Sequence, residues 1–134
     1  MENDELKKKI LEEMRVDYSG SLQKNFEKAK QFVKITPTGL IDVINKDRLN
    51  GKTQIALYLI GKAYAKEAGL TQSEAVSNNE LMEQLGIKMG SLLPWLKNLR
   101  DRNEIKQITQ GKNTFHLISP AVIEKTLDKA GAKK

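Results

Sequence analysis

The segment Lys52–Ala68 most constrains how this chain folds, because its side-chain pattern requires a long helix with a wide apolar face. Asn50 or Gly51 can begin this helix, and Gly69 can end it. The apolar residues recur at helical spacing: Ile55, Ala56, Leu59, Ile60, Ala63 and Tyr64. A face this wide needs partners on several sides, so we expect the helix to lie at the centre of the core.

The first fifty residues form an extension with a different pattern. Asp4–Arg15 and Ser21–Gln31 each carry a narrow apolar stripe that predicts a helix, and Ser19-Gly20 is expected to separate them. β-Branched residues flank Thr36-Pro37-Thr38-Gly39, which predicts a hairpin over Phe32–Ile44.

Two shorter helices are expected after the long one. Ser77 can cap the first, and Glu80, three residues later, would complete a capping box before Gly86 ends the helix. Ser91 is expected to cap the second, which places Pro94 in the first turn, where proline is tolerated. The core stripe of this second helix is Leu92, Trp95, Leu96 and Leu99.

The C-terminal part predicts a second hairpin and a last helix. Ile105–Thr109 and Thr114–Ile118 read as strands joined by a turn at Gly111–Asn113. Phe115 and Leu117 are expected to face the core, which would leave His116 on the surface. A helix over 120–130 and a loose basic tail over 131–134 follow.

Composition excludes several classes of function. The chain has no cysteine and one histidine, so disulfides, thiolate chemistry and imidazole clusters are excluded, and we expect no metal, no cofactor and no enzymatic activity. Gly51-Lys52-Thr53 lacks the glycine of a phosphate loop, because position 46 is lysine. No apolar run is long enough to span a membrane and the N-terminus does not read as a signal peptide, so we expect a cytoplasmic protein.

Positive charge gathers in the C-terminal part of the chain. The formal net charge is +6, of which residues 1–50 carry +1 and residues 51–134 carry +5. Residues 86–112 hold six basic side chains against Asp101 and Glu104, directly after an acidic stretch over 71–85. This clustering favours a nucleic-acid partner more than the net charge does.

The order of these elements resembles a known family. A helix, a capped helix, a tight turn, a helix and a hairpin, with the run Ser77–Ile87, resemble the winged helix-turn-helix of archaeal and bacterial transcription regulators. The resemblance covers about residues 52–118. It implies a mainly α fold with a small β-hairpin wing (α+β), divided into an extension over 1–50, the winged domain over 51–119, and a C-terminal helix and tail over 120–134.

The resemblance also implies a function and a site. The protein would be a double-stranded DNA-binding transcriptional regulator, with a recognition helix over about 91–102 in the major groove and the wing over 105–118 on the backbone or minor groove. The residues placed at the DNA are Lys88, Met89, Ser91, Pro94, Lys97, Asn98, Arg100, Arg102, Lys106, Gln110, Lys112 and Asn113.

Two features leave alternatives open. Leu93 and Pro94 are apolar but lie off the core stripe, which indicates a protein partner. The alternative is therefore a winged-helix interaction module in a replication, transcription or RNA-processing assembly; RNA binding is a further one. Three helices outside the motif carry unpaired apolar stripes, so we also expect a homodimer, with the N-terminal pair as its interface.

Overall fold

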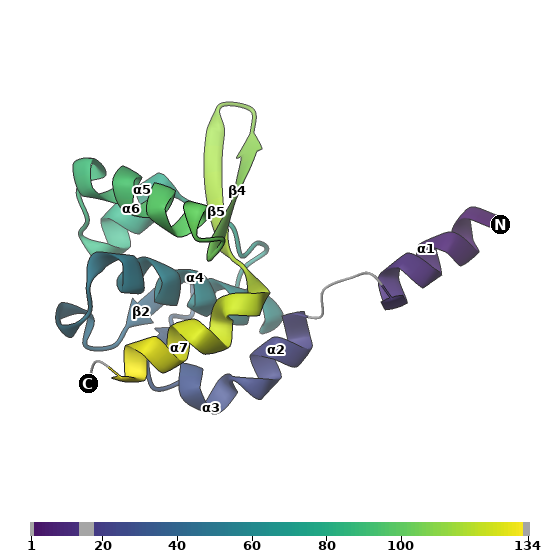
Figure 1. Cartoon of the computed structure of the whole chain (residues 1–134), viewed down its shortest axis with the longest axis horizontal. Helices are drawn as coiled ribbons and strands as arrows, with labels where there is room; N and C mark the ends of the chain where they lie inside the picture. Colours follow the sequence, from purple (N-terminus) through teal and green to yellow (C-terminus); the bar gives the residue numbers. More distant parts are fainter. Residues whose placement is uncertain (1, 14–17, 133–134) are drawn as a thin grey trace.

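The chain forms a mixed α+β fold with two small sheets (Figure 1). The structure, a computed structural model, describes residues 2–13 and 18–132. The elements in chain order are α1 (Glu2–Glu13), α2 (Tyr18–Lys24), α3 (Phe26–Ala29), β1 (Val33–Ile35), β2 (Ile41–Val43), the 3-10 helix η1 (Lys46–Arg48), α4 (Gly51–Glu67), β3 (Val76–Ser77), α5 (Asn78–Leu85), α6 (Met89–Asp101), β4 (Ile105–Gln110), β5 (Asn113–Ile118), the 3-10 helix η2 (Pro120–Val122) and α7 (Ile123–Ala132).

Helix α4 lies at the centre of the core, as its wide apolar face predicts. Every side chain from Ile55 to Ala63 is buried, and the helix contacts both sheets as well as α2, α5, α6 and α7. The Asn50 side chain caps it by accepting a hydrogen bond from the Thr53 amide at 2.8 Å. Any side chain at Gly51 would overlap the Trp95 ring, so glycine is needed where α6 crosses the start of α4.

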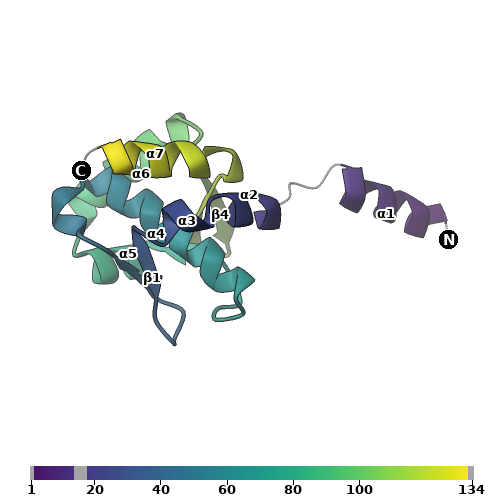
Figure 2. The ribbon, with the colours of Figure 1, turned by 90° about the horizontal axis from the view of Figure 1, so that it is seen from below.

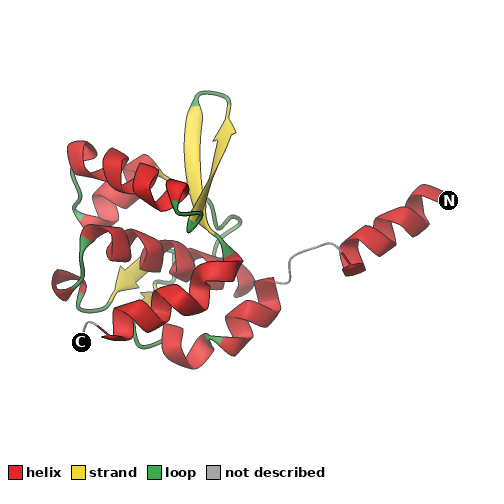
Figure 3. Cartoon of the chain, in the orientation of Figure 1, coloured by secondary structure: helices red, strands yellow, loops and turns green. Residues whose placement is uncertain are grey.

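The two sheets are separate hairpin-based units (Figure 3). Strands β1 and β2 pair antiparallel, which confirms the hairpin predicted over Phe32–Ile44. The second sheet has the order β3-β5-β4, and β3 is a strand that the sequence analysis missed. The β4–β5 turn has two residues, with Gly111 at φ +63°, as a type II′ turn requires.

Helix α7 and the 3-10 helix before it pack against α2 and α3. Buried Leu22 and Ala29 pack into the core cluster together with Leu127, and the Tyr64 hydroxyl donates to the Leu22 carbonyl at 2.6 Å. Lys28 pairs with Asp128 at 2.9 Å. The α7 stripe and two residues of the α2–α3 stripe, Leu22 and Ala29, are therefore covered within the chain, while Phe26 is 50% exposed, which weakens the argument for α2 and α3 as a dimer interface.

Helix α1 stands apart from the rest of the chain in both ribbon views (Figures 1 and 2). Leu6 and Ile10, on its apolar stripe, are exposed. Two predicted boundaries differ nearby: Ser19-Gly20 belongs to α2, and Asn25 separates α2 from α3. Arg15, the expected end of the first helix, lies outside the described residues. At the other end, Gly131 belongs to α7, and the rest of the predicted tail is described only as far as residue 132.

The start of α6 lies earlier than expected. The helix begins at Met89, and the amides of Ser91 and Leu92 both donate to the Lys88 carbonyl, so Ser91 is not the cap. Pro94 consequently lies inside the helix, beyond the first turn. It removes the hydrogen bond to the carbonyl of Gly90, and because Gly90 is exposed, that carbonyl can bind water instead.

The predicted orientation of β5 is wrong. His116 is buried at 1% exposure, while Phe115 is half-buried on the opposite face of the strand. The cause is the third strand: Val76 of β3 pairs with His116, and Asn78 Oδ1 lies 2.6 Å from His116 Nε2. The Nδ1 atom has no hydrogen-bond partner among the described residues. A neutral ring that donates from Nε2 fits this environment.

We expect His116 to make the protein less stable in acid. Burial, with a smaller effect from the Arg100 charge, lowers its pKa to about 4. The unfolded chain, with a pKa near 6.5, therefore binds more protons, and the free energy of unfolding should fall by about 2 to 3 kcal/mol between pH 7 and pH 4.5 through this residue alone. Urea denaturation of the parent and of His116→Gln at both pH values measures it. Equal pH dependence in the two proteins would contradict the assignment.

Candidate nucleic-acid interface

A tight turn between α5 and α6 sets the surface on which most predicted site residues lie. Gly86 ends α5 in the left-handed conformation at φ +69°, and Ile87 is buried directly after it. The Leu92, Leu96 and Leu99 side chains then hold one face of α6 against the core. The opposite face of α6 is consequently exposed, beside the β4–β5 hairpin that projects past it (Figure 1).

The structure places the predicted DNA-contacting residues at the surface. All of them are exposed except Arg100, which is half-buried. Those on or next to α6 are Lys88, Met89, Ser91, Pro94, Lys97, Asn98, Arg100 and Arg102; those on the β4–β5 hairpin are Lys106, Gln110, Lys112 and Asn113. The two groups lie on elements that pack against each other.

Their charges are not equally available. Lys97 pairs with Asp101 at 2.9 Å, so contact with a phosphate would require it to leave a carboxylate. Lys88, Lys106 and Lys112 have no ion-pair partner within the described part of the chain, and they are the cations that this surface offers most freely. Lys52, which the sequence analysis did not place here, donates to Asn98 Oδ1 at 3.2 Å and adds a cation beside α6.

Apolar side chains share this surface with the lysines. Met89 is 42% exposed, Leu93 48% and Ile108 40%, and Pro94 is also exposed. A surface that mixes free lysines with exposed apolar residues can bind the sugar-phosphate backbone, but few groups on it are suited to reading guanine, which arginine contacts most often.

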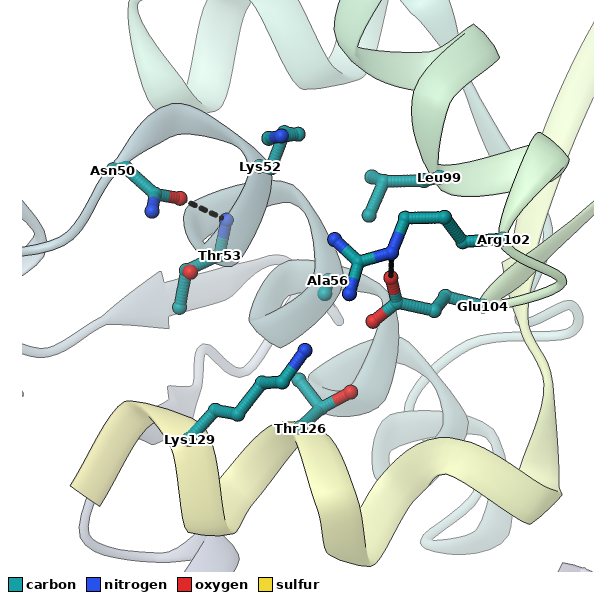
Figure 4. Close-up of a pocket in the computed structure, with 9 residues that line it drawn as sticks. All are labelled: Asn50, Lys52, Thr53, Ala56, Leu99, Arg102, Glu104, Thr126 and Lys129. Carbon is teal, nitrogen blue, oxygen red and sulfur yellow. Dashed lines mark hydrogen bonds and ion pairs between the residues drawn. The ribbon is translucent and has the colours of Figure 1, made fainter. Parts of the chain in front are cut away.

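Arg102 points away from this surface into a neighbouring pocket (Figure 4). Its Nε atom lies 3.1 Å from Glu104 Oε2, an ion pair without an aligned hydrogen bond. The pocket, of about 120 Å³, is lined by Asn50, Lys52, Thr53, Ala56, Leu99, Arg102, Glu104, Thr126 and Lys129. The contact of Arg102 with DNA stays a prediction, although this side chain already has a partner in Glu104.

The residues that the structure describes offer neither a metal cluster nor a membrane-spanning helix. Over 2–13 and 18–132, no group of three histidine, cysteine, aspartate or glutamate side chains could hold a metal ion. No helix in the same ranges has the length and apolar character needed to cross a membrane.

Comparison with protein-family models, with curated proteins and with solved structures finds no match to this chain. The function is therefore inferred from the geometry and charge of this surface.

Proposed function

We propose that this chain is a winged helix-turn-helix protein that binds double-stranded DNA and regulates transcription, with α6 as the recognition helix and the β4–β5 hairpin as the wing. The observation that carries the proposal is the set of lysines Lys88, Lys106 and Lys112, which lie at the start of α6 and on the adjoining hairpin and have no ion-pair partner among the described residues. A helix held by one buried face, with its other face exposed beside a projecting hairpin, can enter a major groove while the hairpin reaches the backbone.

The element order supports this proposal. Helix α5, the Gly86 turn, helix α6 and the β4–β5 hairpin follow one another, and β3 adds a strand to the edge of the hairpin. The contacts between α5 and α6, and between α6 and β4, make one unit of these elements. The proposed binding is largely non-specific in its chemistry, because lysine contacts phosphates and carries little base information.

The test is the salt dependence of binding to a short duplex. Lys112→Gln removes one proposed phosphate contact at the wing tip, so the slope of log K against log salt concentration should become less steep by about one. Affinity should fall to a similar extent on unrelated duplex sequences. Lys97→Gln should flatten the slope less, since Asp101 already pairs with that lysine at 2.9 Å.

Lys34→Gln provides the matched control. Lys34 is an exposed lysine in β1, on the other sheet, so the same loss of charge should leave the slope as it is. If Lys112→Gln and Lys34→Gln change the slope equally, the α6 and hairpin surface is not the DNA interface.

A protein-interaction module is the second candidate function, and the exposed apolar residues of α6 favour it. Met89, Leu93 and Pro94 lie on the face that would otherwise meet the groove. In that case the lysines would surround an apolar contact with an acidic protein partner. The homodimer also stays a proposal, now with α1 as the element whose apolar side chains are exposed.

A further inference from the structure

The pocket between α4, α6 and α7 has features that the proposed DNA interface does not use. Its charged residues are Lys52, Arg102, Lys129 and Glu104, which gives a formal charge of +2. Figure 4 shows the Arg102 guanidinium and the Lys129 ammonium pointing into the same space from opposite sides. Cations that converge without enough carboxylates repel one another, so this arrangement of side chains favours binding of an anion.

The buried carboxylate of Glu104 positions Arg102. Glu104 is 5% exposed, and its Oε2 atom lies 3.1 Å from Arg102 Nε. This pairing engages the inner edge of the guanidinium and leaves the two terminal nitrogens directed toward the pocket (Figure 4). Arginine held in this way presents a planar pair of donors, a geometry that matches two oxygens of a phosphate or carboxylate.

An unsatisfied hydroxyl gives an independent indication of a ligand. Thr126 is 4% exposed, lines the pocket from α7, and its Oγ1 atom has no hydrogen-bond partner among the residues that the structure describes. A buried hydroxyl without a partner costs free energy, and native proteins nearly always give such a group a partner. A ligand oxygen in the pocket would supply one.

The start of α4 also lies at this pocket. Asn50 and Thr53 line it, and the positive end of the helix dipole points from this terminus. The segment before α4 is the 3-10 helix η1 instead of a glycine-rich loop, so the site differs from a phosphate loop and relies on side chains from three helices.

We propose that this pocket binds a single phosphate group, held by Arg102 and Lys129, with the Thr126 hydroxyl donating to one of its oxygens. A tetrahedral oxyanion accepts several hydrogen bonds from different directions, which suits donors that come from α7 and from the residue that follows α6. The phosphate could belong to a small molecule or to a DNA backbone, and the two sources are separable by experiment.

The first arm titrates the full-length protein with inorganic phosphate by calorimetry, at constant ionic strength set with chloride. We expect saturable binding, and a thermal midpoint that rises with phosphate concentration. Lys129→Gln and Thr126→Val should each weaken binding by about tenfold, the effect of losing one hydrogen bond to a charged group. Thr126→Val retains the shape of the side chain and removes a hydroxyl that has no protein partner, so the fold should persist.

Lys125→Gln is the matched control, because Lys125 is an exposed lysine of α7 that does not line this pocket. It should leave phosphate affinity unchanged. The second arm measures the salt slope for a short duplex with the same variants. A backbone phosphate in the pocket predicts a flatter slope for Lys129→Gln and competition by free phosphate, whereas a small-molecule phosphate predicts equal slopes for Lys129→Gln and Lys125→Gln.

The predicted effect in either experiment supports phosphate binding in the pocket, and the comparison of the two shows whether the phosphate comes from a small molecule or from DNA. The proposal is overturned if phosphate shows no saturable binding and Lys129→Gln matches Lys125→Gln on the duplex. It is also overturned if these two variants weaken phosphate binding equally. The phosphate arm does not depend on DNA binding, and Lys112 does not line the pocket, so failure here leaves the proposed function to its own test.

Discussion

Glu80→Ala should lower the free energy of unfolding by about 3 to 5 kcal/mol, because it removes the common partner of two buried groups. Glu80 Oε2 accepts a hydrogen bond from the Tyr58 hydroxyl at 2.6 Å and pairs with Lys62 Nζ at 3.1 Å. Tyr58 is fully buried and Lys62 is 5% exposed, so water cannot readily replace the lost carboxylate. Burial, followed by the Glu80 contact, raises the pKa of Tyr58, which keeps it a donor.

Urea denaturation of Glu80→Ala and Glu83→Ala measures this effect with a matched control. Glu83 is an exposed glutamate on the same helix, and its substitution should change stability by less than about 0.5 kcal/mol. Adding Lys62→Met to Glu80→Ala should recover part of the loss, since the double variant no longer buries an unpaired charge. Equal losses in the two single variants would mean that solvent screens the Lys62–Glu80 pair.

The same contact shows where local sequence rules reach their limit. Ser77 caps α5 as predicted, with the Glu80 amide 3.1 Å from Ser77 Oγ, but the Glu80 carboxylate bonds to α4 instead of completing the capping box. The spacing of Ser77 and Glu80 is a local signal, whereas Tyr58 and Lys62 reach Glu80 only once α4 and α5 pack. The sequence could predict the cap but not the ion pair.

Hydrophobic patterns that extend over several turns, together with turn-forming glycines, predicted the helices and hairpins well. The α4 pattern spans five turns, and Gly69, Gly86 and Gly111 all adopt positive φ at the ends or turns assigned to them. Short signals did less well: β3 has two residues, too few for any periodicity, and its pairing decides which face of β5 is buried. Hydrophobicity alone favoured Phe115 over His116, although Ile118, two residues further on, is buried on the same face as His116.

The candidate site likewise has one part that the sequence could predict and one part that it could not. Exposure of the predicted residues on α6 follows from its buried stripe, so their surface position could be expected from sequence. Arg102 is different, because buried Glu104 draws it into the pocket with Thr126 and Lys129, which lie more than twenty residues along the chain. No local pattern brings these three side chains together, and the packing of α7 on α4 is what does so.

Leu99→Ala should lower the free energy of unfolding by about 2 to 5 kcal/mol, because it leaves a void under the helix that carries the proposed interface. Leu99 is 3% exposed and belongs to the same buried face of α6 as Leu92 and Leu96. It also lines the pocket, so the void would join a space that is already present and would not close by a small shift of α6. The loss is measurable by urea denaturation at neutral pH.

Leu93→Ala is the control that isolates burial from helix propensity, because it makes the same substitution in the same helix at a side chain that is 48% exposed. Its effect on stability should stay within about 0.5 kcal/mol. The difference between the two variants therefore measures what the buried face of α6 contributes to the fold. If both substitutions change stability equally, α6 does not bury the face that carries Leu92, Leu96 and Leu99. The opposite face of α6 would then not be the surface that is presented to DNA.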